Sequence, residues 1–220
     1  MLTDPMSRPR TLLGARRRCN AAAALMLMAA ALIIAVPAAN ASQVGRSSNP
    51  AHAAQGCANA DTPAVGASRN AMRAAVTCLI NQQRVSRHLP ALREESRLDR
   101  SAQDWTDGMI RTGAFWHGSD FATRITAAGY NWSAAGENIA TGYSTPRAVV
   151  SAWMASTGHC QNILDPSFSN VGTGIGRNPV SASSSGGAAW TQDFGLPMGQ
   201  PAPSTNFGPA HGCPYQTSAG

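Results

Sequence analysis

The chain has 220 residues, of which 43% are hydrophobic and 13% charged, and this composition excludes a disordered or fibrous protein. All 17 basic residues are arginines and the formal net charge is +6, but five of those arginines lie within the first 18 residues. Without residues 1–41 the chain keeps 12 basic and 10 acidic residues, a balance of about +2. So small a charge excludes a strong electrostatic case for binding nucleic acid.

Residues 1–41 have the pattern of a secretory signal peptide. A basic N-terminal part precedes the apolar run 21–36, which at 16 residues is short for a membrane span. The small-residue sequence Ala39-Asn40-Ala41 then predicts cleavage after Ala41. We therefore expect a secreted protein, extracellular or periplasmic, with no transmembrane segment after cleavage.

Four cysteines follow the predicted cleavage site, and an even number in an exported chain predicts two disulfides. Their long spacings, with no C-x-x-C motif, do not match a metal site. Of the three possible connectivities we favour Cys57–Cys78 and Cys160–Cys213.

Composition divides the rest of the chain into three parts. Residues 42–68 are small and polar and predict a flexible N-terminal segment. Residues 69–197 hold most of the aromatic side chains and predict one domain. Residues 198–220 form a tail rich in proline and glycine, which Cys213 would attach to the domain.

Apolar spacing predicts helices in the first part of the domain. A helix over 69–87 would bury Met72, Val76 and Ile80, with Arg84 off that face. A second would begin with Ser96 as N-cap and end at Gly113. Further helical segments are expected over 121–128, from Pro146 with Thr145 as N-cap, and over 159–164.

The pattern then changes to alternation, which predicts strands at 171–176 and 188–194. In the first of these, glycine occupies one face, so another element should pack very close to it. Helices followed by strands indicate the α+β class.

Three residues stand out as carriers of chemistry. Glu137 lies in an apolar stretch without a charged neighbour, so its carboxylate needs hydrogen bonds, a cation or a raised pKa. His117 and His159 lie where predicted helices end, a usual place for binding residues. Each of the three, taken alone, also fits a structural role.

A series of ordered motifs across residues 75–196 resembles the bacterial branch of the CAP superfamily, also called the SCP-like extracellular domain. The motifs are Phe115-x-His117, Arg124, Ala128-Gly129-Tyr130, Gly136-Glu137-Asn138-Ile139-Ala140, Gly158-His159-x-x-Asn162-Ile163-Leu164 and Trp190-Thr191-Gln192-Asp193-Phe194-Gly195. The resemblance implies an α-β-α sandwich with a central antiparallel sheet and a cleft lined by His and Glu.

In eukaryotic relatives this cleft holds two His and two Glu and can bind Zn²⁺. His117 and Glu137 match two of those four positions, whereas the others fall near Ser156 and at Ala189. The bacterial motif supplies His159 instead, and Cys160 stands where that motif has arginine.

The resulting hypothesis is a cleft formed by His117, Glu137 and His159, with Asn138 and Gln192 as further ligand-binding candidates. It would bind a small-molecule, lipid or cell-wall ligand, and the first three residues could hold zinc. The alternatives are a metal- or His-dependent hydrolase, for which no activated nucleophile is evident, and a structural or interaction protein of the envelope. We expect a monomer.

Overall fold

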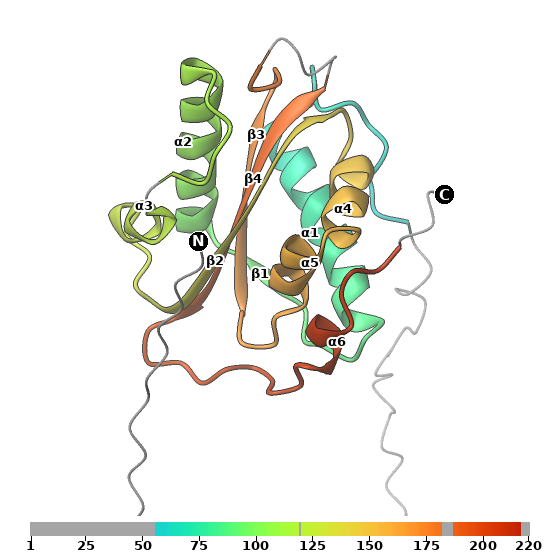
Figure 1. Cartoon of the computed structure of the whole chain (residues 1–220), viewed down its shortest axis with the longest axis vertical. Coiled ribbons are helices and arrows are strands. Elements are labelled where there is room, and N and C mark those ends of the chain that lie inside the picture. The colour runs from blue at the N-terminus through green and yellow to red at the C-terminus, as the bar shows by residue number, and fades with distance from the viewer. Residues whose placement is uncertain (1–55, 119, 182–186, 217–220) are drawn as a thin grey trace, which may run out of the picture. The chain divides into compact units, whose positions relative to one another are not determined.

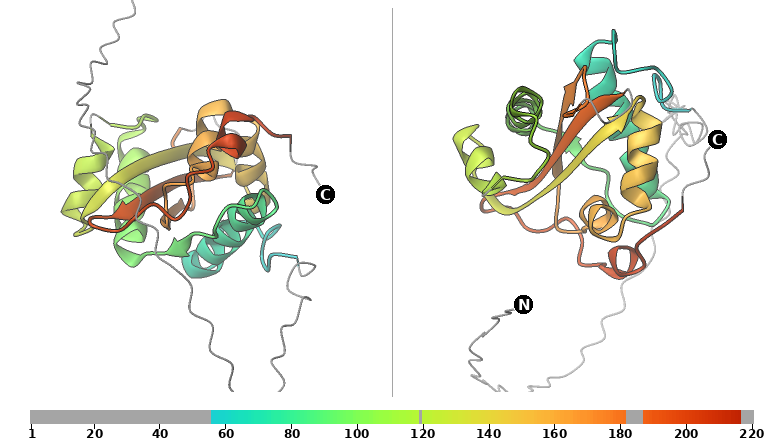
Figure 2. Two further views of the ribbon diagram at one scale, coloured as in Figure 1. Left: turned by 90° about the horizontal axis from the view of Figure 1, so that it is seen from below. Right: turned by 45° about the horizontal axis from the view of Figure 1, so that its top comes forward.

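The computed structural model describes residues 56–118, 120–181 and 187–216, and it has three layers (Figure 1). The predicted signal peptide, 1–41, lies outside the described residues. One face of the central sheet is covered by α2 (Ser96–Thr112) and α3 (Phe121–Ala127). The other is covered by α1 (Arg69–Val85), α4 (Pro146–Met154) and α5 (Thr157–Leu164). The turned views keep the same layering (Figure 2), so the predicted α-β-α sandwich of the α+β class is confirmed.

The sheet has the strand order β1-β3-β4-β2. Its strands are β1 (Arg93–Glu94), β2 (Trp132–Tyr143), β3 (Asn170–Gly176) and β4 (Ala188–Pro197). The three long strands pair antiparallel, as expected, and only the two-residue β1 adds a parallel pairing to β3. Strand β2 was not predicted from alternation, because its central residues are buried on both faces.

The register of β2 against β4 separates the predicted site residues. Glu137 pairs with Asp193, and its neighbour Asn138 pairs with Gln192. Because successive side chains point to opposite faces, Glu137 and Asp193 face α2 and α3, whereas Asn138 and Gln192 face α5. Of the candidate residues, Glu137 therefore lies on one face of the sheet, and Asn138 and Gln192 lie on the other.

The glycines of β3 admit the backbone of α2, as predicted. A Cβ atom at Gly172 would lie 2.2 Å from the backbone of α2, and one at Gly174 would lie 2.2 Å from the carbonyl oxygen of Ala102. Helix α2 is therefore seated directly on the sheet.

Where the short β1 no longer pairs with β3, side chains form hydrogen bonds to the backbone of β3. Asp99 accepts a 2.8 Å hydrogen bond from the backbone N–H of Thr173, and Gln103 bonds both the N–H and the carbonyl of Ile175. Arg73 donates to the carbonyl of Thr173. These contacts satisfy backbone groups that a longer neighbouring strand would otherwise pair.

The prediction that Arg84 lies off the buried face of α1 is wrong. Its side chain is fully buried and donates to the carbonyl oxygens of Pro90, Ile163 and Asp165 at 2.8–2.9 Å. Position 84 follows Ile80 by one turn and so belongs to the buried face. Burial lowers the pKa of Arg84 to about 10, and its guanidinium closes the C-terminal end of α5.

Two predicted helix starts also change. The N-cap of α2 is Glu95 rather than Ser96, and its carboxylate accepts from the N–H of Arg97. Helix α5 begins at Thr157, two residues earlier than predicted. The cap at Thr145 is confirmed, since its hydroxyl accepts from the N–H of Ala148.

The packed body extends beyond residues 69–197 on both sides. In the described part of the predicted flexible segment, Ala60 and Ala64 are buried, and a disulfide joins Cys57 to Cys78. In the tail, α6 (Gly208–His211) packs beside α5, where Cys160 and Cys213 form the second disulfide. Both favoured pairings are thus present. Among the described helices, none has the length and apolar character needed to cross a membrane.

We predict opposite stability effects for two glycine-to-alanine substitutions. Gly174→Ala forces a methyl group into the backbone of α2 and should lower the free energy of unfolding by about 1–3 kcal/mol or more. Gly158→Ala adds a methyl group with no atom within 4 Å in a helix and should raise it by about 0.5–1 kcal/mol. Urea unfolding measures both, and equal effects would contradict the close seating of α2.

Candidate functional site

The carboxylate of Glu137 is held by two cationic or polar partners. Its side chain is only 1% exposed, in the middle of β2. His117, in the segment after α2, places Nδ1 2.9 Å from Oε1, and Arg124 of α3 bonds Oε2 through Nη2. Arg124 also donates to the carbonyl oxygen of His117 at 3.0 Å. The predicted need of this buried acid for a cation and hydrogen bonds is therefore met.

This contact determines which nitrogen of His117 faces solvent as an acceptor. An ionised carboxylate can only accept hydrogen bonds, so Nδ1 of His117 donates to Glu137. In the neutral form of the ring, Nε2 is then the acceptor. Half of the His117 side chain is exposed, so a ligand hydroxyl or amide can reach it.

His159 approaches the same region from the opposite layer. It lies in the first turn of α5, where its Nδ1 is 2.9 Å from the hydroxyl oxygen of Ser156, the N-cap residue. Burial lowers the pKa of His159, and the charge of His117 lowers it further. Both effects favour a neutral imidazole at His159.

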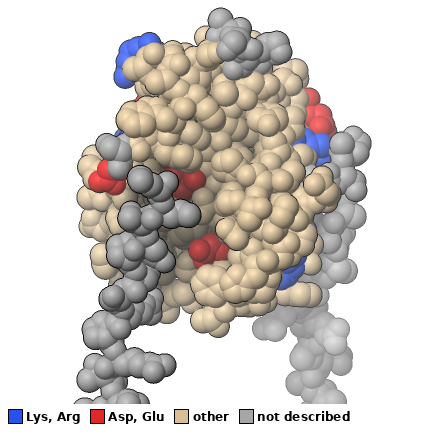
Figure 3. Space-filling model, in the orientation of Figure 1, with Lys and Arg blue, Asp and Glu red and all other residues tan. Residues whose placement is uncertain are grey.

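A cavity of about 260 Å³ adjoins His159 at the edge of the sheet. Its walls come from the segment after α2, from β2, from α4 and from the start of α5. They are formed by Phe115, Ile139, Ala140, Thr141, Tyr143, Ala152, Trp153, Ser156 and His159. Most of the molecular face drawn in Figure 3 is uncharged, with scattered acidic and basic side chains. Among the residues that line the cavity, none is an arginine or an acid. The cavity is therefore suited to an uncharged group.

Asn138 and Gln192 lie inside the protein rather than on its surface. Both are fully buried, and the amide of Asn138 donates to the carbonyl oxygen of His159 at 3.2 Å and to Oε1 of Gln192. Asn162 donates to the carbonyl oxygen of Glu137 and to Oδ1 of Asn138. In this conformation these amides attach α5 to β2 and so position His159.

Asp193 is a second buried acid, directly across the strands from Glu137. Burial raises the pKa of Asp193 well above its ordinary value, and the charge of Glu137 raises it further. Nearby Ser101 and Arg124 offset this only in part. The neutral form of the Asp193 carboxyl group is therefore favoured.

The sequence did not single out Arg124, Ser156 or Asn162 as site residues. Arg124 and Asn162 were present within the motifs, but only the fold shows that one pairs with Glu137 and the other joins α5 to β2. Ser156 was placed near the position of a glutamate ligand in the eukaryotic relatives, but nothing in the sequence indicated its contact with His159.

The donors present do not fit the four-ligand zinc site implied by the resemblance. Ser156 and the fully buried Ala189 replace two ligands, and the carboxylate of Glu137 is already paired with Arg124. Across the described ranges, no three His, Cys, Asp or Glu residues form a group that could hold a metal ion. No step of the function is therefore derived through zinc.

The chain matches the family model described as the cysteine-rich secretory protein family, CAP, over residues 77–194. It belongs to the CAP family. The match includes His117, Glu137 and His159, and it agrees with the three-layer fold.

Two bacterial relatives agree with this assignment. The uncharacterized protein YkwD of Bacillus subtilis (strain 168) is 35% identical over 138 residues, which cover 60% of this chain and 50% of YkwD. The chain thus spans about half of that relative's length. An extracellular SCP-domain protein of Bacillus anthracis str. Ames has a similar fold, with a TM-score of 0.51 and 24% identity over 59% of this chain and 44% of its own.

We predict that Asp193→Asn stabilises the CAP domain at neutral pH. The raised pKa of Asp193 means that the folded state loses stability as the pH rises from about 4, the ordinary aspartate value, through the folded-state value. The variant should therefore be more stable by about 1–3 kcal/mol at pH 7. Urea unfolding from pH 4 to pH 7.5 should show the difference shrinking toward acidic pH, and a constant difference would contradict the role of ionisation.

Proposed function

We propose that the chain is an exported CAP protein that binds an extracellular or cell-envelope ligand in the cleft beside His117, Glu137 and His159. Two disulfides support export, because they persist in oxidising compartments. The N-terminal pattern of a basic segment, an apolar run and Ala39-Asn40-Ala41 supports secretion through a cleaved signal peptide.

The observation that carries the binding proposal is the cavity that adjoins His159. Its lining residues Phe115 and Ile139 are each two positions along the chain from the bonded pair His117 and Glu137. Glu137 orients one imidazole and leaves its Nε2 as an acceptor, while His159 stays neutral next to apolar walls. A preformed cavity with apolar walls and a few oriented polar groups is the usual form of a small-ligand site. An uncharged part of a lipid or a cell-wall component matches this chemistry.

One observation favours the alternative of a His-dependent hydrolase. The hydroxyl oxygen of Ser156 lies 2.9 Å from Nδ1 of His159, and both residues line the cavity. A neutral imidazole at that distance can accept the proton of an attacking hydroxyl. The same contact also closes the first turn of α5, so catalysis is the second proposal.

We predict that His159→Asn weakens ligand binding by roughly three- to tenfold, the effect of losing one hydrogen bond to the ligand. Co-sedimentation of the mature protein with isolated bacterial cell walls, and with vesicles of extracted bacterial lipids, measures the binding. His88→Asn is the matched control, because His88 is exposed on a turn with positive φ that asparagine tolerates. It should bind like the parent.

The outcomes separate the three functions. Equal binding by His159→Asn and the parent contradicts the cleft proposal. Release of soluble products that Ser156→Ala abolishes establishes the hydrolase. A large drop in melting temperature for His159→Asn, with no binding by the parent protein, supports a structural or interaction role.

We predict that the exported protein begins at Ser42, since the pattern places cleavage after Ala41. Intact-mass measurement of protein collected outside the cytoplasm tests this. A mass that includes residues 1–41 would contradict the signal peptide.

A further inference from the structure

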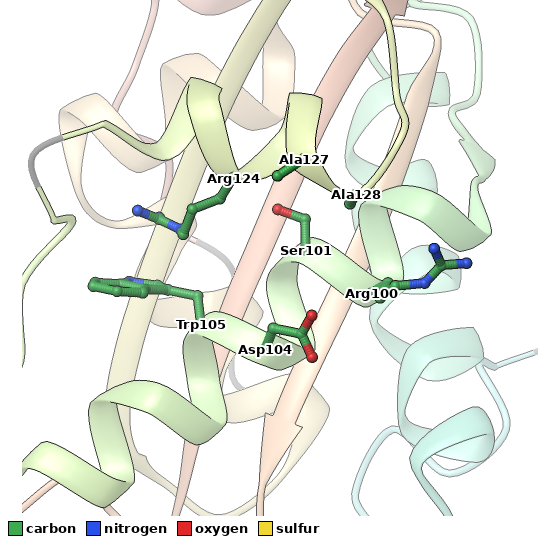
Figure 4. Close-up of a pocket in the computed structure, with 7 residues that line it drawn as sticks. All are labelled: Arg100, Ser101, Asp104, Trp105, Arg124, Ala127 and Ala128. Carbon is green, nitrogen blue, oxygen red and sulfur yellow. The ribbon is translucent and has the colours of Figure 1, made fainter.

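A second cavity lies between α2 and α3, and His117, Glu137 and His159 do not line it. Its volume is about 250 Å³. Figure 4 shows the seven residues that form it: Arg100, Ser101, Asp104, Trp105, Arg124, Ala127 and Ala128. Within each helix, the spacing of the lining residues places them on one face. The two faces border the same cavity.

Small side chains on α3 leave this space open. Ala127 and Ala128 extend no further than Cβ, and they lie opposite Ser101 of α2 (Figure 4). At one end Arg124 stacks on Trp105, with its guanidinium carbon 3.9 Å from the ring centroid. The apolar walls therefore accept a short aliphatic group but no large ring.

A polar group is available at the base of the cavity. Ser101 is 3% exposed, and Figure 4 shows its hydroxyl directed toward Ala127. The polar neighbour of this hydroxyl is the carboxyl group of Asp193, whose pKa a hydrogen bond from Ser101 lowers. Among the described residues no contact of the hydroxyl oxygen meets both the distance and the angle of a hydrogen bond. A hydroxyl that donates to Asp193 keeps lone pairs on its oxygen, which can accept a hydrogen bond from a ligand.

Two charges of opposite sign lie on the rim without pairing to each other. Arg100 and Asp104 are one helical turn apart, yet the guanidinium of Arg100 extends away from the carboxylate of Asp104 (Figure 4). Neither takes part in any of the ion pairs formed within the described ranges. Arg124, by contrast, is already paired with Glu137.

We propose that this cavity binds a small zwitterion, an amino acid or short peptide with an ammonium group, a carboxylate and small aliphatic side chains. The ammonium group meets Asp104 and the hydroxyl of Ser101, on the side nearer the buried acid Asp193. The carboxylate meets Arg100, and methyl groups rest on Ala127 and Ala128. The volume, slightly below that of sites for drug-sized molecules, suits a ligand of this size. The inference is independent of the function proposed for the His/Glu cleft.

The probe is L-alanyl-L-alanine, added to the folded mature protein while the indole N–H signal of Trp105 is followed by NMR. A saturable shift of that signal is expected. N-acetylated dialanine, which lacks the ammonium group, and dialanine amide, which lacks the carboxylate, should each bind roughly three- to tenfold more weakly, as for partly solvated ion pairs. Free alanine and trialanine then establish which length fits best.

Variants locate the site. Arg100→Gln and Asp104→Asn should each weaken dialanine binding by roughly three- to tenfold, and Ala127→Leu should abolish it by filling the cavity. Arg111→Gln is the matched control on the same helix, because Arg111 is exposed, unpaired with any acid and outside the cavity. It should bind like the parent. No saturable shift, equal binding of the blocked peptides, or unchanged binding by Arg100→Gln and Asp104→Asn would each overturn the proposal.

Discussion

The buried carboxylate of Glu137 is the constraint around which the site is arranged. A charge inside a sheet costs several kcal/mol unless cations and donors surround it. Arg124 reaches it from α3 and His117 from the segment after α2, and Arg124 also bonds the backbone of His117. The carboxylate of Glu137 therefore joins α3 to the sheet and orients the imidazole of His117, and its charge raises the pKa of Asp193.

The opposite layer positions its histidine by different means. Asn138 and Asn162 join β2 to α5 through amide hydrogen bonds, and Arg84 binds the carbonyl groups at the end of α5. The disulfide of Cys160 follows His159 directly and ties α5 to the C-terminal tail. These polar and covalent contacts hold the ring of His159 beside the cavity, where mostly apolar walls keep it neutral.

The edge strand β2 connects the two layers, because its alternation sends Glu137 to one face and Asn138 to the other. A ligand at this edge can therefore meet groups from both layers of the sandwich. The cavity between α2 and α3 differs in character, since unpaired charges lie on its rim. Arg124 borders that cavity and also binds Glu137, so the two places share one side chain while their chemistry differs.

The sequence by itself determined the class of the fold, most of the helices and two of the strands, and it marked His117, Glu137 and His159 as candidate site residues. It could do so because hydrophobic period, capping residues and ordered motifs are local properties of the chain. The need of Glu137 for a cation was also readable, since a carboxylate in an apolar stretch must be compensated.

Only the tertiary structure decided which partners meet. Arg124 reaches Glu137, Asn162 reaches Asn138, and Arg84 lies inside the protein because residues distant in the chain come together there. The strand β2 was not predicted for the same reason. Helices cover both faces of the sheet, so consecutive residues of β2 are buried and the sequence shows no alternation of polar and apolar residues. Strand register then placed Asn138 and Gln192 inside the protein on the face toward α5, because a shift of one residue along a strand exchanges the two faces of a sheet.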